Sequence, residues 1–174
     1  MSERRRYDHV LAIYPNTRGF GFVLLEAPLA PLDWAAVVVP GKNRNRECVR
    51  RITALFGRCA PDVLILQDMD PARSSARRAC RVYDLNEAIA VFAETQGVPV
   101  VRYSREHTKE MFTQFGAPTK QRIAETIAKS IPAFERYVPR IRKPWMSEDA
   151  RMGLFDAAAL AITYFRDVDN RLKM

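Results

Sequence analysis

The segment VLAIYPNTRGFGFVLLE, residues 10–26, predicts two β-strands joined by a tight corner. Residues 10–14 and 20–25 are mostly apolar, and the Asn/Thr/Arg/Gly corner between them is typical of a β-hairpin. The first strand stops abruptly at Tyr14-Pro15. Because a strand that ends in this way presents a side chain at its tip, Tyr14 becomes a candidate functional position.

The rest of the chain predicts an α/β fold that continues from this hairpin. A third strand over residues 34–39 completes an antiparallel meander, and apolar spacing then alternates between helix and strand. Strands are predicted over residues 63–66 and 98–103, and helices over 49–59, 82–95, 104–116, 119–131 and 152–162. This order predicts one α/β domain over residues 1–174, a mixed five-stranded sheet with helices on both faces. We expect residues 1–9 to form a flexible basic N-terminus.

Composition favours a nucleic-acid partner. The 174 residues carry a formal net charge of +8, which suits an anionic ligand. Three cysteines without C-x-x-C spacing and two histidines argue against structural zinc. No apolar run approaches the ~20 residues of a membrane span, and no signal peptide precedes the first strand. We therefore expect a cytoplasmic protein without a membrane partner.

Three motifs, in order, carry a resemblance to a known family. AIYPN (12–16) with the corner TRGFG, the strand VLILQD (63–68) and the helix GLFDAAALAIT (153–163) are the segments concerned. Together they resemble the RuvC-type Holliday-junction resolvases of the RNase H-like superfamily, over nearly the whole chain. The resemblance implies a RuvC-like fold and places the family's two basic positions at Lys109 and Lys120.

The resemblance also implies a metal-dependent nuclease site, which this sequence has largely lost. The family holds divalent metals with four acidic positions, and these correspond here to Tyr14, Gln67, Gly153 and Asp156. A neutral phenol, an amide and a glycine are poor substitutes for carboxylates in binding Mg²⁺. We therefore expect no metal cofactor, with Asp156 as the remnant of the site, and a catalytically degenerate protein rather than an enzyme.

Two alternatives remain open. The first is an active Holliday-junction-type endodeoxyribonuclease with a rearranged carboxylate site, in which Asp156 and a displaced acid such as Asp68 or Asp149 bind Mg or Mn. The second is a non-enzymatic scaffold for a protein partner. If Ser147 caps the last helix, Asp156 lies in the helix interior, where the helix dipole does not explain it.

Basic residues gather in two segments that suit nucleic acid. PARSSARRACR (71–81) corresponds to a border of the DNA cleft in the resolvase fold, and RYVPRIRKPW (136–145) interleaves cations with aromatics. The predicted nucleic-acid contacts are Arg73, Arg77, Arg78, Arg81, Lys109, Lys120, Arg140, Arg142 and Lys143. For the second segment the alternative is a solvated loop anchored by its aromatics. RNRECVRR (44–51) is interpreted as the solvent face of a helix.

The resemblance suggests branched or junction DNA as the partner, and it also suggests a homodimer. In the family the dimer contact uses the helix after the fourth strand. Here that helix, residues 82–95, carries Tyr83, Leu85, Ile89 and Phe92, which could equally fill the core of the monomer.

Overall fold

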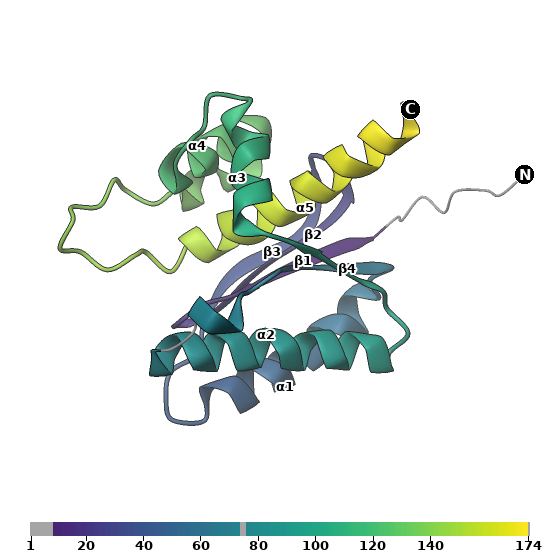
Figure 1. The fold of residues 1–174 in the computed structure, drawn as a ribbon, viewed down its shortest axis with the longest axis vertical. Coiled ribbons are helices and arrows are strands. Elements are labelled where there is room, and N and C mark those ends of the chain that lie inside the picture. Colours follow the sequence, from purple (N-terminus) through teal and green to yellow (C-terminus); the bar gives the residue numbers. More distant parts are fainter. Residues whose placement is uncertain (1–8, 74–75, 174) are drawn as a thin grey trace, which may run out of the picture.

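A five-stranded sheet in the order β3-β2-β1-β4-β5 forms the centre of the fold (Figure 1). The computed structural model describes residues 9–73 and 76–173, so the predicted flexible segment lies, but for His9, outside the described residues. The strands are β1 (Val10–Pro15), β2 (Gly19–Ala27), β3 (Ala30–Val38), β4 (Val63–Gln67) and β5 (Val100–Tyr103). β1, β2 and β3 pair antiparallel, whereas β4 runs parallel to β1 and β5. The predicted mixed sheet is confirmed.

Helices cover both faces of the sheet. In Figure 1, α1 (Arg44–Cys59) and α2 (Arg77–Thr95) lie on one side, and the long α5 (Met152–Leu172) lies on the other. The smaller helices α3 (Arg105–Thr113) and α4 (Lys120–Ser130) lie on the α5 side. Short 3₁₀ turns, η1 (Pro71–Arg73) and η2 (Pro132–Tyr137), follow β4 and α4. None of the described helices is long and apolar enough to cross a membrane.

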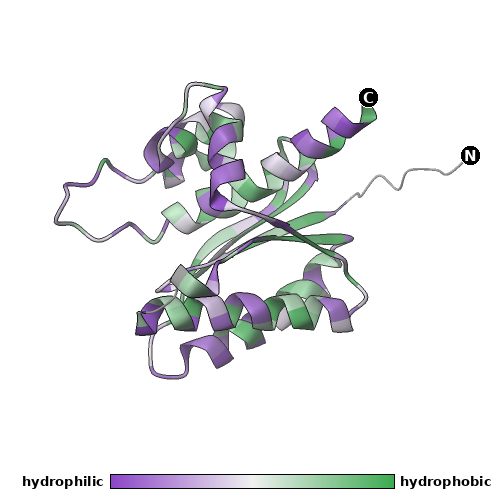
Figure 2. Cartoon of the chain, in the orientation of Figure 1, coloured by the Kyte–Doolittle hydropathy of each residue, from purple (hydrophilic) through white to green (hydrophobic). Residues whose placement is uncertain are grey.

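The alternation of side chains along β1 explains why both faces need covering. Val10 and Ala12 belong to the apolar cluster beneath α5, and Leu11 and Ile13 to the cluster beneath α1 and α2. Successive side chains of a strand point to opposite faces, so a strand that is apolar throughout requires a layer on each side. In Figure 2 the strands are largely hydrophobic, whereas the helices alternate between hydrophobic and hydrophilic residues.

A pair of glycines lets α5 approach the sheet closely. A Cβ atom added to Gly21 of β2 would lie 1.9 Å from the carbonyl oxygen of Gly153, near the start of α5. Only a residue without a side chain fits at such a distance. This contact fixes the first turn of α5 against β2, and thereby positions the residues that follow Gly153.

Several predicted boundaries are wrong. β3 begins at Ala30 rather than at residue 34, because a register shift near Leu25 lets the strand continue past Pro31. α3 ends at Thr113, before Gly116, whose φ of +73° is left-handed. α5 begins at Met152, so Ser147 does not cap it.

The helix predicted over residues 82–95 begins earlier, at Arg77. Its Leu85 and Ile89 are 2% and 1% exposed and pack in the core of this chain, which leaves them no part in a dimer contact. Phe92 packs partly against the same core, with its ring 5.1 Å from that of Phe56.

Candidate nucleic-acid interface at the strand tips

The tips of β1 and β4 lie side by side, because these strands are parallel neighbours. Tyr14 and Gln67 stand at the two tips and line a pocket of about 350 Å³ with Asp156 of α5. Lys109 and Lys120 line the same pocket. Three of the four positions that the resemblance matches to the family's acids thus converge in one pocket with both basic positions.

Local hydrogen bonds hold the two tips in place. After β1, the side-chain oxygen of Asn16 accepts hydrogen bonds from the backbone N–H groups of Arg18 at 2.9 Å and Gly19 at 3.0 Å. Such an Asx turn reverses the chain at once, which leaves Tyr14 at the edge of the sheet. The amide of Asn86 in α2 donates to the carbonyl oxygen of Gln67 at 3.0 Å and so ties the β4 tip to α2.

An ammonium group occupies the centre of this arrangement. Lys120 Nζ lies 2.9 Å from Glu148 Oε1 and 3.1 Å from Asp156 Oδ2, and 5.6 Å from the centre of the Tyr14 ring. Thr119 caps α4, since its hydroxyl accepts from the backbone N–H of Arg122 at 3.3 Å. A cation at a helix start opposes the helix dipole; here the two carboxylates offset that cost.

Burial and charge shift the ionisation of this cluster. Burial raises the pKa of Asp156 to about 6, against the lowering influence of Lys120. Burial lowers the pKa of Lys120, but the negative charge of Asp156 and the hydrogen bond to Glu148 outweigh it, so the pKa is raised overall. Burial and Asp156 raise the pKa of Tyr14 to about 12. At neutral pH, Tyr14 is a neutral phenol and Lys120 is charged.

No family model matches the chain, and no curated protein matches it. Solved structures do. T. thermophilus RuvC in complex with Holliday junction substrate matches with a TM-score of 0.66 and 23% identity, over 92% of this chain and 96% of that one. A second Thermus thermophilus RuvC structure matches with a TM-score of 0.57 and 21% identity, over 93% and 96% of the two chains. The yeast mitochondrial Holliday junction resolvase Ydc2 matches with a TM-score of 0.61 and 12% identity, over 95% and 82%. The chain has a RuvC-like fold.

The strand tips of this RuvC-like fold offer few free oxygen ligands for a divalent metal among the described residues. The β1 tip holds a neutral phenol, and the ammonium of Lys120 already bonds the carboxylates of Asp156 and Glu148. Among residues 9–73 and 76–173, no three or more His, Cys, Asp or Glu side chains gather in a way that could hold a metal ion. Mg²⁺ requires several oxygen ligands in near-octahedral geometry, so we assign no step to a metal.

The displaced acids do not join Asp156. Asp68 is exposed and lines an adjoining groove, which shares Tyr14 and Gln67 with the pocket but does not include Asp156. Asp149 lies before α5, and its carboxylate accepts a hydrogen bond from Arg151 at 2.6 Å. The acid that does reach the cluster is Glu148, which no motif in the sequence singles out.

Gly153 does not line the pocket at the strand tips. A Cβ atom built on it would lie 2.8 Å from the side-chain nitrogen of Asn16, and the residue lines a different hollow. Of the four positions matched to the family's acids, Gly153 is therefore the one that the structure separates from the others.

The arginines of the first basic segment lie around the start of α2. Arg77 and Arg78 are exposed, while Arg81 is partly buried and donates to the carbonyl oxygen of Thr17 at 3.0 Å. The side chain of Arg73 lies outside the part of the chain that the structure describes. This segment stands next to the corner after β1, and so close to the strand tips.

The second basic segment forms part of a long loop, residues 138–151, which extends from the body of the molecule (Figure 1). Arg140, Arg142 and Lys143 are exposed on it, and Trp145 is 78% exposed, with Lys143 Nζ 5.3 Å from its ring. The alternative of a loop anchored by its aromatics is therefore wrong for Trp145. It holds for Tyr137, which packs partly against the core.

Sequence reasoning also missed two cations. Arg18 and Arg44 line a hollow together with Arg78 and Arg81. The sequence pattern places Arg44 on a solvent-facing helix surface, but its side chain turns back to bond the carbonyl oxygens of Val39 and Thr17. Of these two residues, only Arg18 could have been identified from the sequence, because it stands in the corner that follows β1.

Proposed function

We propose that this chain binds nucleic acid through its strand tips and basic segments, with branched or junction DNA as the preferred form, and that it does not cleave it by metal-dependent chemistry. The observation that carries the proposal is the ammonium of Lys120, held between Asp156 and Glu148 beneath Tyr14. Because this ammonium already bonds both carboxylates, it competes with a divalent cation for them. Contact with phosphate then falls to the other cations around the tips.

The surroundings of the tips support a nucleic-acid partner. Lys109 and Lys120 line the tip pocket, and Arg140 and Lys120 line a shared pocket at the base of the loop 138–151. Arg77 and Arg78 are exposed at the start of α2. Cations spread along one edge position a phosphate backbone without reading its sequence. A solved RuvC of the same fold is described in complex with Holliday junction substrate, which supports junction DNA as the partner here.

A comparison of substrates tests the proposal directly. We expect the purified protein to bind a fluorescent four-way junction more tightly than the linear duplex of the same arm sequence. We expect it to leave the junction intact in Mg²⁺ or Mn²⁺, as judged on denaturing gels. Equal affinity for both substrates would remove the junction preference. Metal-dependent cleavage abolished by Asp156→Asn would instead establish the rearranged endonuclease, with Asp156 and Glu148 as the first carboxylates to examine.

The arginines at the start of α2 provide a second test. Replacing Arg77, Arg78 and Arg81 together with alanine should lower DNA affinity about ten- to a hundredfold and flatten the dependence of log affinity on log salt by up to ~3, about one for each phosphate that an arginine no longer binds. Anisotropy titrations at several salt concentrations measure both quantities.

The matched control removes the same charge elsewhere. Arg46, Lys129 and Lys173 are exposed and lie outside the two basic segments, so their triple alanine variant should change the affinity and the slope much less. If the two triple variants behave alike, net charge and not this segment determines binding, and a scaffold with a non-specific basic surface becomes the better description.

A further inference from the structure

A second hollow, of about 530 Å³, lies beside the corner that follows β1. Its walls come from that corner, from the first turns of α1 and α2, and from the segment that precedes α5. Arg18, Arg44, Arg78 and Arg81 line it, and Tyr14 does not. The volume lies within the range of small-ligand sites in proteins, roughly 300–1,000 Å³.

Two of these arginines converge on one oxygen atom. Arg81 Nη2 donates to the carbonyl oxygen of Thr17 at 3.0 Å, and Arg44 Nη1 donates to the same oxygen. Arg44 Nε also donates to the carbonyl oxygen of Val39 at 2.6 Å, which fixes its orientation. Because two guanidinium groups share a single neutral acceptor, their positive charges lie side by side, and like charges at such a separation repel each other.

The acids at the hollow do not neutralise these charges. Glu148 bonds Lys120 at 2.9 Å, and Asp149 bonds Arg151 at 2.6 Å. Within the described ranges, no carboxylate lies within ion-pair distance of the side chains of Arg18, Arg44, Arg78 or Arg81. The hollow therefore carries net positive charge.

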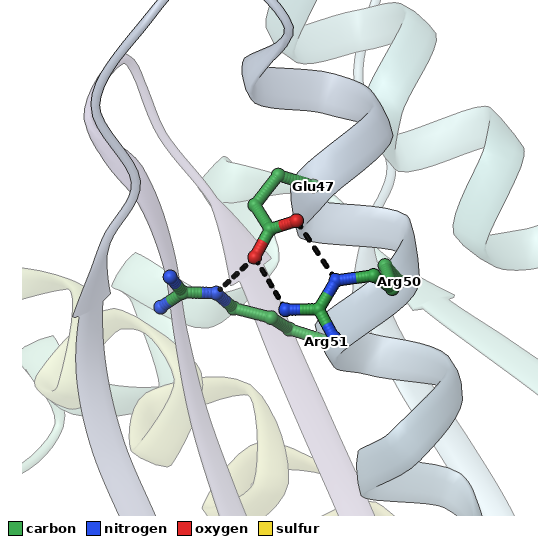
Figure 3. A network of polar contacts seen from close by, with 3 residues as sticks. All are labelled: Glu47, Arg50 and Arg51. Carbon is green, nitrogen blue, oxygen red and sulfur yellow. Dashed lines mark hydrogen bonds and ion pairs between the residues drawn. The ribbon is translucent and has the colours of Figure 1, made fainter.

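The helix ends at the hollow add to this charge. Neither Asn43 before α1 nor Ala76 before α2 forms a side-chain capping hydrogen bond, and the first turn of α2 contains no acid. The first turn of α1 does contain Glu47, but Figure 3 shows its carboxylate bonded to Arg50 and Arg51, at 2.6 and 2.9 Å for the closest contacts. Both helix ends thus present partial positive charge next to cations, an arrangement that an anion stabilises.

The floor of the hollow offers a further donor. Asn16 uses its side-chain oxygen in the Asx turn, and no acceptor among the described residues bonds its side-chain nitrogen. That nitrogen faces Gly153, where the absence of a side chain leaves the hollow open. Guanidinium groups and an amide N–H that surround one space match the oxygens of a phosphate.

From this geometry we propose that the hollow is a phosphate-binding site, and that it holds a backbone phosphate of the nucleic acid bound at the strand tips. The choice of a nucleic acid as the source of the phosphate rests on the proposed function. The groove that passes the β1 tip shares Asn16, Thr17 and Glu148 with the hollow, so one strand can contact both. Phosphate in the hollow would relieve the repulsion between Arg44 and Arg81.

The test uses Arg18→Ala/Arg78→Ala, because neither of these two side chains forms a hydrogen bond with another described residue, and the variant should fold. Arg44 and Arg81 stay in place, since they hold the corner after β1. The control, Arg46→Ala/Lys129→Ala, removes the same charge at exposed positions outside the hollow. Inorganic phosphate is titrated into each protein while the Nε–Hε resonances of Arg44 and Arg81 are followed by NMR, and junction DNA affinity is measured by anisotropy at one salt concentration.

We expect phosphate, but not chloride at equal ionic strength, to shift the Arg44 and Arg81 resonances. The double variant should weaken phosphate and DNA binding about tenfold, with less than about a twofold change in the control. Unchanged DNA affinity in the double variant, with wild-type binding intact, overturns the site and leaves the proposed function standing. Phosphate binding in the hollow by a protein that binds no DNA overturns the proposed function, and shows that the site takes free phosphate. No shift of either resonance in the wild type also overturns the site.

Discussion

Gly21→Ala is expected to destabilise the folded protein by about 3 kcal/mol or more, at the upper end of the cost of inserting a methyl group into a packed interior. The new Cβ would lie 1.9 Å from the Gly153 carbonyl oxygen and 2.7 Å from the backbone nitrogen of Leu154. Those atoms belong to the backbone, which cannot turn aside as a flexible side chain does. α5 must then move away from β2, and the apolar contacts beneath it loosen.

Gly57→Ala provides the matched control for urea unfolding measurements. Gly57 lies within α1, and a Cβ built there meets nothing within 4 Å. The same chemical change should raise the free energy of unfolding by about 0.5–1 kcal/mol, because alanine is the better helix residue. If the free energy of unfolding of Gly21→Ala lies within about 1 kcal/mol of the wild-type value, then α5 does not pack directly on the backbone of β2.

The second large effect is a pH dependence that Asp156 gives to stability. Its side chain is 13% exposed, and burial raises its pKa from 3.8 to about 6, with Lys120 and Arg105 opposing and Glu148 adding to the rise. The folded chain thus binds this proton more tightly than the unfolded chain. The resulting stabilisation is complete below about pH 4 and is lost as the pH rises through 6. Its upper limit is about 3 kcal/mol for a pKa that rises from 3.8 to about 6.

Asp156→Asn removes this titration, so we expect its free energy of unfolding to change less between pH 4 and pH 7 than that of the wild type. The pKa of Tyr14, about 12, and the raised pKa of Lys120 keep both groups outside this pH window. Asp84→Asn, at an exposed position on α2, controls for the loss of an acid and should keep the wild-type profile. Parallel pH profiles for Asp156→Asn and the wild type would contradict the burial of an ionisable Asp156.

The fold was predictable because its signals are local. A few neighbouring residues are enough to recognise the alternation along β1, the corner at Asn16 and the apolar run of β4. These signals determine the order and type of the elements. Boundaries failed where tertiary pairing decided them. β3 extends back to Ala30 because β2 offers a partner there, and not because the residues around Pro31 favour a strand.

The site was predictable only in part, because most of its contacts join distant segments. Resemblance placed Tyr14, Gln67, Asp156 and Lys120 correctly in one pocket. Glu148 reaches Lys120 across 28 residues, and Arg44 meets Thr17 across 27. No rule based on sequence spacing predicts such contacts, because they depend on how the segment before α5 and the start of α1 pack against the folded sheet.

The ammonium of Lys120 has a further consequence, because a lysine and a dissociable metal ion reach such a site in different ways. A dissociable ion fills its centre according to its concentration in the surroundings, whereas a lysine arrives with the polypeptide, one per chain. Under the proposed function, such a centre has no apo form, cannot be stripped by a chelator, and cannot be loaded with the wrong metal. The positive charge of Lys120 is thus set by translation and folding, whereas the charge of the whole cluster still follows the protonation of Asp156.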